Sequence, residues 1–362
     1  MQIRDRPLTC CTLETVQPPV LNIQQNVPLA PYTTFRIGGP ARFFADITSE
    51  AALLEAIAYA RTNNLPIFVL GGGSNLLVAD EGFPGLVLHI ANKGIEQQAD
   101  TFHVAAGEDW DHFVSHAVEK NYAGIECLAG IPGTVGGTPV QNVGAYGQEV
   151  AETITAVRVL DLKTLRFEEL TPGACGFAYR RSIFNSAKRG RYIVTRVDYR
   201  LAKDGAPRID YADLKERFAG VDSPSLAEVS AAVRNIRHQK GMLIVPNDPD
   251  CRSAGSFFKN PVISAGHYAS MAAQHGEQVP HYPAPNGEFK LPAAWLLDQA
   301  GFHKGYTLGP AGISSRHTLA LINKGQARAA DILALRDRIV ADVEKKFGIR
   351  LEPEPVWLGP GS

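Results

Sequence analysis

The chain has 362 residues, enough for two or three domains that each bury a hydrophobic core. Hydrophobic residues make up 45% and charged residues 20% of it, as in an ordinary globular protein. The 36 Lys and Arg residues nearly balance the 37 Asp and Glu residues, so the net charge of −1 offers no electrostatic basis for binding nucleic acid or an anionic membrane. Any charged ligand must therefore be held by a local cluster of residues.

No stretch is apolar over the roughly 20 residues that a membrane-spanning helix needs, and residues 1–19 lack the apolar core of a signal peptide. We therefore expect a cytoplasmic protein in which residues 1–19 form a loose N-terminal extension. The cysteines are odd in number and form no C-x-x-C pair, which argues against a disulfide framework and against a zinc site. We expect no bound metal. The cysteines are Cys10, Cys11, Cys127, Cys175 and Cys251.

The first strong pattern alternates strand and helix. Residues 49–64 have the apolar spacing of a helix, with Ser49 as its N-cap and Glu50 in its first turn. An apolar strand pattern over residues 66–70 follows and runs directly into glycines. This order of helix, strand and glycine loop is typical of α/β nucleotide-binding proteins.

A second unit begins with a strand pattern over residues 102–108. Residues 109–122 follow with apolar side chains at i, i+3, i+4, i+7 and i+8, which predicts a helix with one apolar face. Beyond a glycine-rich loop, two long strand patterns occupy residues 153–164 and 192–201. The unit closes with a helix pattern over residues 226–240 that has a basic end.

A third unit follows a change in composition, since residues 241–251 are rich in Pro and Asp. It contains a helix pattern around Ile332, Leu335, Ile339 and Val343. The last pattern, over residues 349–359, is a strand interrupted by two prolines, which predicts an edge strand or an irregular one.

Two glycine loops could hold phosphate groups. Gly71–Asn75 follows an apolar strand and offers successive backbone N–H groups as an anion-binding nest. The loop from Gly130 to Gly137 is also rich in glycine and could bind an anion in the same way. The chain contains no G-x-G-x-x-G sequence and no Gly-Lys pair, so the Rossmann and Walker A signatures are both missing. Two glycine loops without either signature point toward another type of flavin fold.

Ser256 is a candidate proton donor. It lies between the small residues Ala254 and Gly255 and the apolar residues Phe257 and Phe258, so polar neighbours can reach its hydroxyl from one side. The alternative is a buried serine bonded to its own backbone, which is the commoner case for a lone serine. A hydrolytic serine is a poorer fit, because these five residues do not form a G-x-S-x-G elbow.

Five motifs together carry a family resemblance. LGGGSNLLV, GIPGTVGGTPVQNVGAYG, YRRSIF, SAGSFFKNP and LEPE occur in this order over residues 20–359. They closely resemble the UDP-N-acetylenolpyruvoylglucosamine reductase family, flavoenzymes that complete UDP-N-acetylmuramic acid for peptidoglycan. IDYADLKERF resembles the lid loop of the family's type I members, which would make Tyr211 the lid residue.

The resemblance implies an α/β (α+β) architecture of the vanillyl-alcohol-oxidase (PCMH) type, in which two subdomains clasp FAD and a C-terminal α+β domain binds the substrate. We expect the first FAD-binding subdomain at residues 20–95, completed by a C-terminal strand within 350–362. The second would span residues 96–239, and the substrate-binding domain residues 240–349. We expect a monomer.

Carried over position by position, the resemblance also implies site residues. The expected FAD-binding residues are Gly71, Gly72, Gly73, Ser74, Asn75, Gly130, Pro132, Gly133, Gly136, Gly137, Gln141, Asn142 and Gly147. The expected substrate-binding residues are Tyr179, Tyr211, Lys240, Asn260 and Lys304, with Lys290 as a weaker candidate. His317 stands where a relative has a substrate-contacting glutamine.

The implied reaction is reduction of an enolpyruvyl ether to a lactyl ether, with NADPH reducing FAD in a first half-reaction. Hydride addition to the vinyl carbon leaves negative charge beside the substrate carboxylate, which must be stabilised and then protonated. Ser256 is the expected proton donor and Arg180 the expected carboxylate ligand; motif position alone favours Arg180 over Arg181. Glu354 is expected near the same carboxylate, either hydrogen-bonding the enol or orienting Arg180.

Two rival functions share this fold. A flavin oxidase would reduce oxygen readily and ignore the sugar nucleotide. A non-catalytic flavin-binding protein should have lost at least one of Ser256, Arg180 and Glu354, and all three are present.

Overall fold

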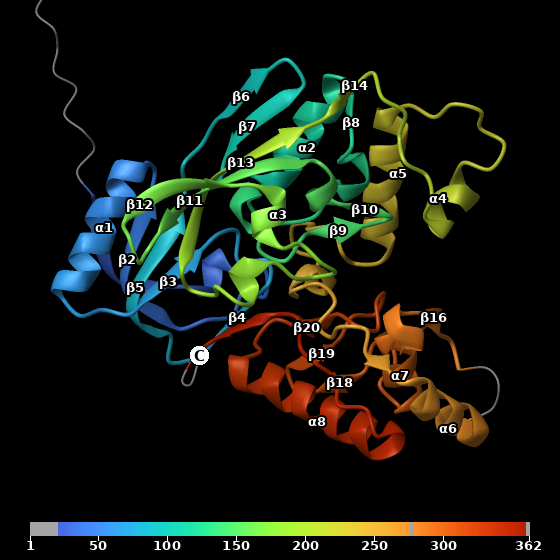
Figure 1. Cartoon of the computed structure of the whole chain (residues 1–362). Helices are drawn as coiled ribbons and strands as arrows, with labels where there is room; N and C mark the ends of the chain where they lie inside the picture. Colours follow the sequence, from blue (N-terminus) through green and yellow to red (C-terminus); the bar gives the residue numbers. More distant parts are fainter. Residues whose placement is uncertain (1–20, 276–278, 360–362) are drawn as a thin grey trace, which may run out of the picture.

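The computed structural model of the chain describes residues 21–275 and 279–359, so the predicted extension with Cys10 and Cys11 lies outside the described residues. Two sheets and their helices occupy the first two thirds of the chain, in blue to yellow in Figure 1. A smaller α+β part follows, in orange and red, and lies below the two sheets in this view (Figure 1).

The first sheet is mixed and carries helix α1 (Glu50–Thr62). Its strand order is β1-β2-β5-β3, in which β2 and β3 both run parallel to β5. The predicted helix and its cap are confirmed, because Ser49 Oγ accepts a hydrogen bond from the Ala52 N–H at 3.1 Å. The strands are β1 (Ile23–Pro28), β2 (Pro40–Ile47), β3 (Ile67–Leu70) and β5 (Phe83–Ile90).

The second sheet is antiparallel and has the strand order β12-β11-β13-β7-β6. Helices α2 (Trp110–Glu119) and α5 (Leu226–Gln239) accompany it, as their apolar spacing predicts. The rings of Trp110 and Phe113 pack on the Tyr199 ring, with centroids 5.9 and 5.1 Å apart. The strands are β6 (Ile95–Gln98), β7 (Thr101–Ala105), β11 (Ile154–Asp161), β12 (Arg166–Leu170) and β13 (Tyr192–Arg200).

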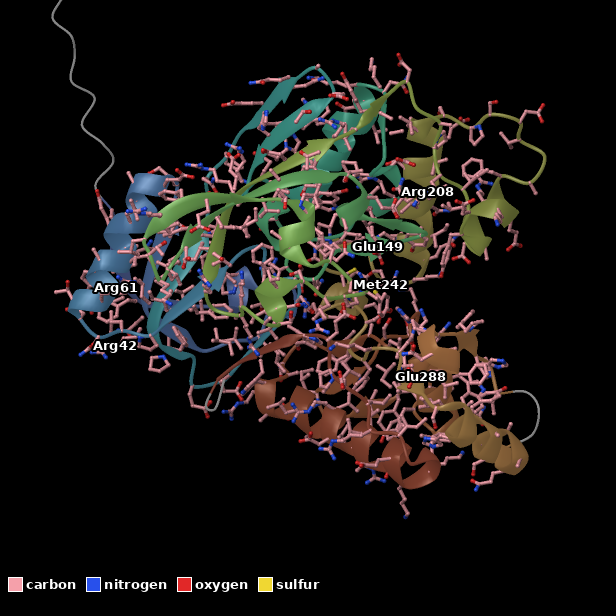
Figure 2. All side chains as sticks on the ribbon, in the orientation of Figure 1. Arg42, Arg61, Glu149, Arg208, Met242 and Glu288 are labelled. Carbon is pink, nitrogen blue, oxygen red and sulfur yellow. The ribbon has the colours of Figure 1, made fainter. Side chains whose placement is uncertain are left out.

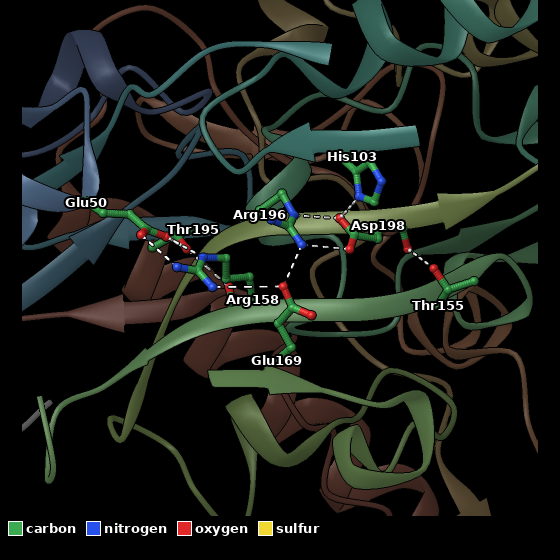
Figure 3. A network of polar contacts seen from close by, with 8 residues as sticks. All are labelled: Glu50, His103, Thr155, Arg158, Glu169, Thr195, Arg196 and Asp198. Atoms are coloured by element: carbon green, nitrogen blue, oxygen red, sulfur yellow. Dashed lines mark hydrogen bonds and ion pairs between the residues drawn. The ribbon is translucent and has the colours of Figure 1, made fainter. Parts of the chain in front are cut away.

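A polar network ties α1 to the second sheet (Figure 3). The guanidinium of Arg158 on β11 donates to both oxygens of Glu50, at 2.7 and 3.0 Å, and Thr195 Oγ1 on β13 donates to the same carboxylate at 2.9 Å. Also on β13, Arg196 pairs with Asp198 at 2.7 Å. One hydrophobic core also runs through both sheets, so packing and charge fix them against each other.

The C-terminal part has its own core, which includes Phe257 and Phe258 and is covered by the long helix α8 (Ala329–Phe347). The predicted apolar face of this helix is confirmed, because Ile332, Leu335 and Ile339 are fully buried. The other elements are α6 (Ala265–His275), α7 (Ala293–Gln299), β15 (Val262–Ile263), β16 (Tyr282–Pro283), β17 (Phe289–Lys290), β18 (Thr307–Leu308), β19 (Ala311–Ile313) and β20 (Leu321–Asn323).

The chain then returns to the first glycine loop. The irregular strand predicted over residues 349–359 is regular only in β21 (Val356–Leu358), which runs parallel to β4 (Leu76–Val78). Prolines 353 and 355 precede it and have no N–H to donate. The Val356 N–H donates to the Asn75 carbonyl at 2.9 Å, so the end of the chain is fixed beside the Gly71–Asn75 loop.

Several short helices and strands connect the larger elements. None of the helices within residues 21–275 and 279–359 has the length and hydropathy needed to cross a bilayer. The predicted subdomain boundaries stay predictions. The short elements are α3 (Pro172–Cys175), α4 (Ala212–Arg217), β8 (Tyr122–Ala123), β9 (Gly144–Ala145), β10 (Gln148–Glu149) and β14 (Ala202–Lys203).

Candidate active site

A cavity of about 1410 Å³ is lined by residues from all three parts of the chain. Both predicted glycine loops, the Ser256 segment and the Glu354 segment contribute to its wall. Met242, which also lines it, lies where the orange C-terminal part meets the parts above (Figure 2). The volume is sufficient for a dinucleotide and a second ligand, since drug-sized ligands occupy about 300–1,000 Å³.

The two glycine loops meet each other in this wall at Gly72 and Gly133, and the first loop also packs against Tyr32, with no room for a Cβ at either contact. A Cβ on Gly72 would lie 2.6 Å from Gly133 Cα, and a Cβ on Gly73 would lie 1.8 Å from the Tyr32 carbonyl oxygen. Gly73 also has a φ of +60°, which favours glycine. The backbone N–H groups of these loops can therefore approach an anion without side chains in the way, which fits the diphosphate of FAD.

The second loop shows two kinds of glycine. A Cβ on Gly136 would lie 2.7 Å from Ala106 Cβ, so this glycine serves packing inside the protein. A Cβ on Gly137 would meet nothing within 4 Å, and Gly137 lines the cavity. The space beside Gly137 is therefore open to a ligand.

Most predicted FAD-binding residues line the cavity, but three do not. Gly130 lines a smaller neighbouring cavity of about 410 Å³, and its N–H donates to Asp111 Oδ1 at 2.6 Å. Asn142 is buried, and Gly147 contacts Arg208 through its carbonyl oxygen. The predicted residues that line the cavity are Gly71, Gly72, Gly73, Ser74, Asn75, Pro132, Gly133, Gly136, Gly137 and Gln141.

Arg180 sits at the tip of a tight turn that faces the cavity. Reciprocal hydrogen bonds between Ala178 and Arg181, at 2.9 and 3.0 Å, close the turn. Arg180 has a φ of +53°, which is costly for a residue with a side chain and is typical of residues held for a function. Asn142 Nδ2 donates to the Ala178 carbonyl at 3.2 Å, so this buried asparagine supports the turn. Arg180 lines the cavity, whereas its exposed neighbour Arg181 does not.

The side chain of Glu354 lies beside that of Arg180. Its Oε1 lies 3.4 Å from Arg180 Nε, and its side chain is only 16% exposed. Burial raises the pKa of Glu354, and the nearby charges of Arg180 and Lys259 oppose that rise. Arg180 Nε is buried and has no hydrogen-bond partner within the described part of the chain, so a donor is left for a ligand.

Ser256 lines the same cavity, and its hydroxyl is held beside an imidazole. Phe257 and Phe258 are 2% and 1% exposed, so the segment is anchored by apolar packing, as its sequence predicts. The Ser256 Oγ lies 3.3 Å from His317 Nε2. Burial, with Lys240 and Lys304 nearby, lowers the pKa of His317 to about 4.

The predicted substrate residues divide into two groups. Tyr179, Tyr211, Lys240 and Lys304 line the cavity. Asn260 does not, and its Oδ1 accepts a hydrogen bond from the Ala293 N–H at 2.9 Å at the start of α7. Lys290 lies outside the wall as well, with its Nζ 4.9 Å from the centre of the Tyr179 ring.

The predicted lid residue Tyr211 packs at the start of α4. Its ring lies edge-on to the Tyr146 ring, with centroids 5.3 Å apart. Two residues along, Asp213 accepts a hydrogen bond from Lys240 Nζ at 2.5 Å. Two contacts therefore hold α4 at the cavity wall.

Arg237 and Tyr146 are among the cavity residues that were not predicted from the sequence. Arg237 donates to the carbonyl oxygens of Gly130 and Met242, at 3.0 and 2.6 Å, and burial lowers its pKa. Tyr146 lines the wall with a φ of +49°. The basic end of the predicted helix 226–240 was a signal for Arg237, which precedes Lys240 by three residues. Tyr146 lies within the motif GIPGTVGGTPVQNVGAYG, but only the neighbouring Gly147 was selected from that end of the motif.

Comparisons with known proteins agree with this geometry. An FAD binding domain model matches residues 41–164, and the C-terminal domain model of UDP-N-acetylenolpyruvoylglucosamine reductase matches residues 247–358. A UDP-N-acetylenolpyruvoylglucosamine reductase of Thermobifida fusca is 46% identical to the chain, over 92% of this chain and 98% of the relative. A UDP-N-acetylenolpyruvoylglucosamine reductase of Streptomyces coelicolor is 45% identical, over 96% of this chain and 92% of the relative.

The same relationship is found among solved structures. The crystal structure of UDP-N-acetylenolpyruvylglucosamine reductase from Thermus caldophilus matches with a TM-score of 0.66 and 29% identity, over 94% of this chain and 100% of that one. These findings confirm the predicted α+β FAD-binding fold with its C-terminal domain. The chain belongs to the UDP-N-acetylenolpyruvoylglucosamine reductase family of FAD-dependent oxidoreductases.

Proposed function

We propose that this protein reduces UDP-N-acetylglucosamine enolpyruvate to UDP-N-acetylmuramate, a peptidoglycan precursor, with NADPH as the electron source. The observation that carries the proposal is the meeting of Ser256, Arg180 and Glu354 at one cavity whose wall also includes the two glycine loops. The names of the relatives support the same reaction. The monomeric state and the cytoplasmic location expected from the sequence stay predictions.

The glycine loops would hold FAD. The backbone N–H groups of Gly71–Asn75 and of the loop around Gly133 would bind its diphosphate, because the glycines there carry no side chain that would keep the diphosphate away, and the open space beside Gly137 would receive part of the cofactor. Arg237 would add a positive charge, because its hydrogen-bond partners are carbonyl oxygens and the Tyr146 side chain rather than carboxylates. When bound, FAD supplies the two-electron chemistry that links NADPH to the vinyl group of the substrate.

Arg180 would bind the substrate carboxylate and stabilise the negative charge that develops beside it. Its guanidinium is held in place by a tight turn and retains a buried donor for a ligand. Glu354 would hydrogen-bond the same group in its protonated form, which burial beside an anionic substrate favours. A fixed cation and a neutral acid can stabilise an enolate-like charge without reorganising.

Ser256 would then protonate the carbon that bears the carboxylate. A serine hydroxyl is a weak acid, but a carbanion-like centre is basic enough to take its proton. The segment that carries Ser256 is anchored by Phe257 and Phe258 and adjoins Glu354, because the Glu354 N–H donates to the Phe257 carbonyl at 2.8 Å. The proton donor and the charge-stabilising groups therefore belong to one rigid constellation.

The sugar nucleotide would lie along the remaining wall. Lys240 and Lys304 would bind its diphosphate and Tyr179 would contact it, while Tyr211 would close over it as the type I lid. Lys240 would have to exchange its Asp213 partner for the phosphate. Asn260 and Lys290 do not line the wall in this structure, so they would support the substrate site indirectly. Asn260 would act through the start of α7, and Lys290 through the Tyr179 ring.

The test is an anaerobic absorbance experiment on the purified protein loaded with FAD. NADPH is added until the oxidised flavin band disappears, and UDP-N-acetylglucosamine enolpyruvate is then added. We expect the band to return at once, together with UDP-N-acetylmuramate as product. A band that returns only when oxygen is admitted would contradict the proposal and favour a flavin oxidase, and a band that NADPH never bleaches would favour a non-catalytic flavin-binding protein.

A further inference from the structure

His317 is a cavity residue whose imidazole faces the proposed proton donor. Its Nε2 lies 3.3 Å from Ser256 Oγ, although it comes from a different loop of the C-terminal part. No other hydrogen bond of the Ser256 hydroxyl is present within residues 21–275 and 279–359. The orientation of the Ser256 hydroxyl therefore depends on this histidine.

The loop that carries His317 is held rigidly. Asp250 accepts hydrogen bonds from Ser315 Oγ at 2.6 Å, from the Ser315 N–H at 3.1 Å and from Arg316 Nε at 3.0 Å. Arg316 also pairs with Asp248 and donates to the His238 carbonyl at 3.0 Å. The loop next to His317 is thus fixed by a buried carboxylate and a charged network, as expected for a residue that orients another.

The backbone sets the distance between the two side chains as well. The Phe257 N–H, next to Ser256, donates to the Leu319 carbonyl at 2.8 Å. The Ala320 N–H donates to the His317 carbonyl at 3.1 Å and closes the loop in between. The Ser256 and His317 segments therefore lie side by side in a fixed register.

The surroundings of His317 keep its imidazole neutral. Burial is the main cause, and the ammonium groups of Lys240 and Lys304 act in the same direction. A neutral imidazole has one N–H, so Nε2 either donates to Ser256 Oγ or accepts its hydrogen. In the second case the serine hydrogen would point at the histidine and away from the cavity. Only the first arrangement leaves the Ser256 hydroxyl free to donate toward a ligand.

We propose that His317 is a positioning residue for Ser256, which donates its Nε2–H to Ser256 Oγ and so directs the serine proton at the substrate. This inference rests on the proposed function of Ser256. As the Oγ–H bond breaks and the new C–H bond forms, negative charge moves to Oγ, where the His317 hydrogen bond stabilises it. Oγ regains a proton from solvent water before the next turnover.

The test compares His317→Gln with His317→Leu in the two half-reactions, measured separately by rapid mixing without oxygen. Glutamine retains an N–H donor of similar reach, and leucine retains volume only. We expect both variants to be reduced by NADPH at the wild-type rate. We expect the reduced His317→Leu protein to be reoxidised by the enolpyruvyl substrate about 10- to 100-fold more slowly than the wild type, and His317→Gln to stay within several-fold of it.

Two further readouts separate positioning from a general loss of structure. The solvent deuterium isotope effect on reoxidation should be larger in His317→Leu, because proton transfer becomes slower, while the substrate dissociation constant should change little. Nitrogen NMR of the labelled wild type should show the Nε2–H tautomer at His317, a result that does not depend on any substrate. The Nδ1–H tautomer, or wild-type reoxidation of His317→Leu, would overturn the inference. A wild-type protein that the substrate fails to reoxidise would instead overturn the proposed function.

Discussion

Arg180 and Glu354 face each other at the cavity with Nε and Oε1 3.4 Å apart, although they come from the second sheet region and from the last segment of the chain. The backbone of Glu354 is also bonded to Phe257, the neighbour of Ser256. Through Glu354, the turn that carries Arg180 is thus connected to the segment that carries the proposed proton donor Ser256. Two residues further on, the pairing of β21 with β4 fixes the end of the chain beside the Gly71–Asn75 loop.

The role of Glu354 can be tested by its side-chain chemistry. In the protonated form it would donate a hydrogen bond, so Glu354→Gln should retain part of that function while Glu354→Ala should lose it. We expect Glu354→Ala to slow the substrate-dependent half-reaction about 100- to 1,000-fold and Glu354→Gln considerably less. Flavin reduction by NADPH should be unchanged in both variants. Equal losses in the two variants would show that the ionised carboxylate is the active form.

Glu352 is a matched control for these variants. It lies two residues away on the same segment, pairs with Lys259 at 3.3 Å and is 75% exposed. An exposed ion pair contributes little, so Glu352→Gln should leave both half-reactions and the thermal stability close to those of the wild type.

The glycines of the two loops should respond to substitution in two different ways. Gly72→Ala brings a Cβ within 2.6 Å of Gly133 Cα, so we expect it to lower the unfolding temperature of the protein even without FAD. Gly137→Ala places its Cβ in open space, so the apoprotein should keep its stability but bind FAD more weakly. Calorimetry of the apoproteins and titration with FAD measure the two effects. Undiminished FAD affinity in Gly137→Ala would exclude this side of the loop as part of the binding surface.

Local patterns predicted the helices well because their apolar faces repeat along the chain. The N-cap at Ser49 and the buried faces of α2 and α8 are examples. The pairing of β21 with β4 could not be predicted in this way, because parallel partners from opposite ends of the chain leave no local signal. Its regular part is also shorter than the predicted strand, since prolines interrupt the ladder before it.

The site was predictable where the residues form motifs and unpredictable where they act singly. Ser256, Arg180 and Glu354 belong to recognisable motifs, and all three line one cavity. Asn142 also belongs to a motif, yet its amide supports the Arg180 turn from behind the cavity wall. Motif membership alone does not separate residues that contact a ligand from those that shape the backbone. The contact between Ser256 and His317 depends on tertiary structure and has no sequence signature.

The network in Figure 3 predicts a specific pH dependence of stability. Hydrogen bonds from Arg158, and then from Thr195, lower the pKa of Glu50 below its ordinary value of 4.5. Because the folded pKa is the lower one, the contribution of Glu50 to stability is present above pH 4.5 and is lost as the pH falls through the folded pKa. Glu50→Gln should therefore show a flatter dependence of the unfolding free energy on pH in this acidic range.

Glu55 offers the control for that measurement. It is exposed on the same helix, outside the network, so Glu55→Gln should follow the wild-type curve of unfolding free energy against pH. Urea unfolding at a series of pH values gives the three curves. Parallel curves for Glu50→Gln and the wild type would contradict the assigned role of the Arg158 contact.

Ser256→Ala tests the central claim most directly, because only the second half-reaction uses the serine proton. The variant is mixed rapidly with NADPH, and the reduced protein is then mixed with UDP-N-acetylglucosamine enolpyruvate, both without oxygen. We predict flavin reduction at the wild-type rate and reoxidation that is slower by about 100- to 10,000-fold. Equal slowing of both half-reactions, or reoxidation at the wild-type rate, would contradict the account of Ser256 as the proton donor.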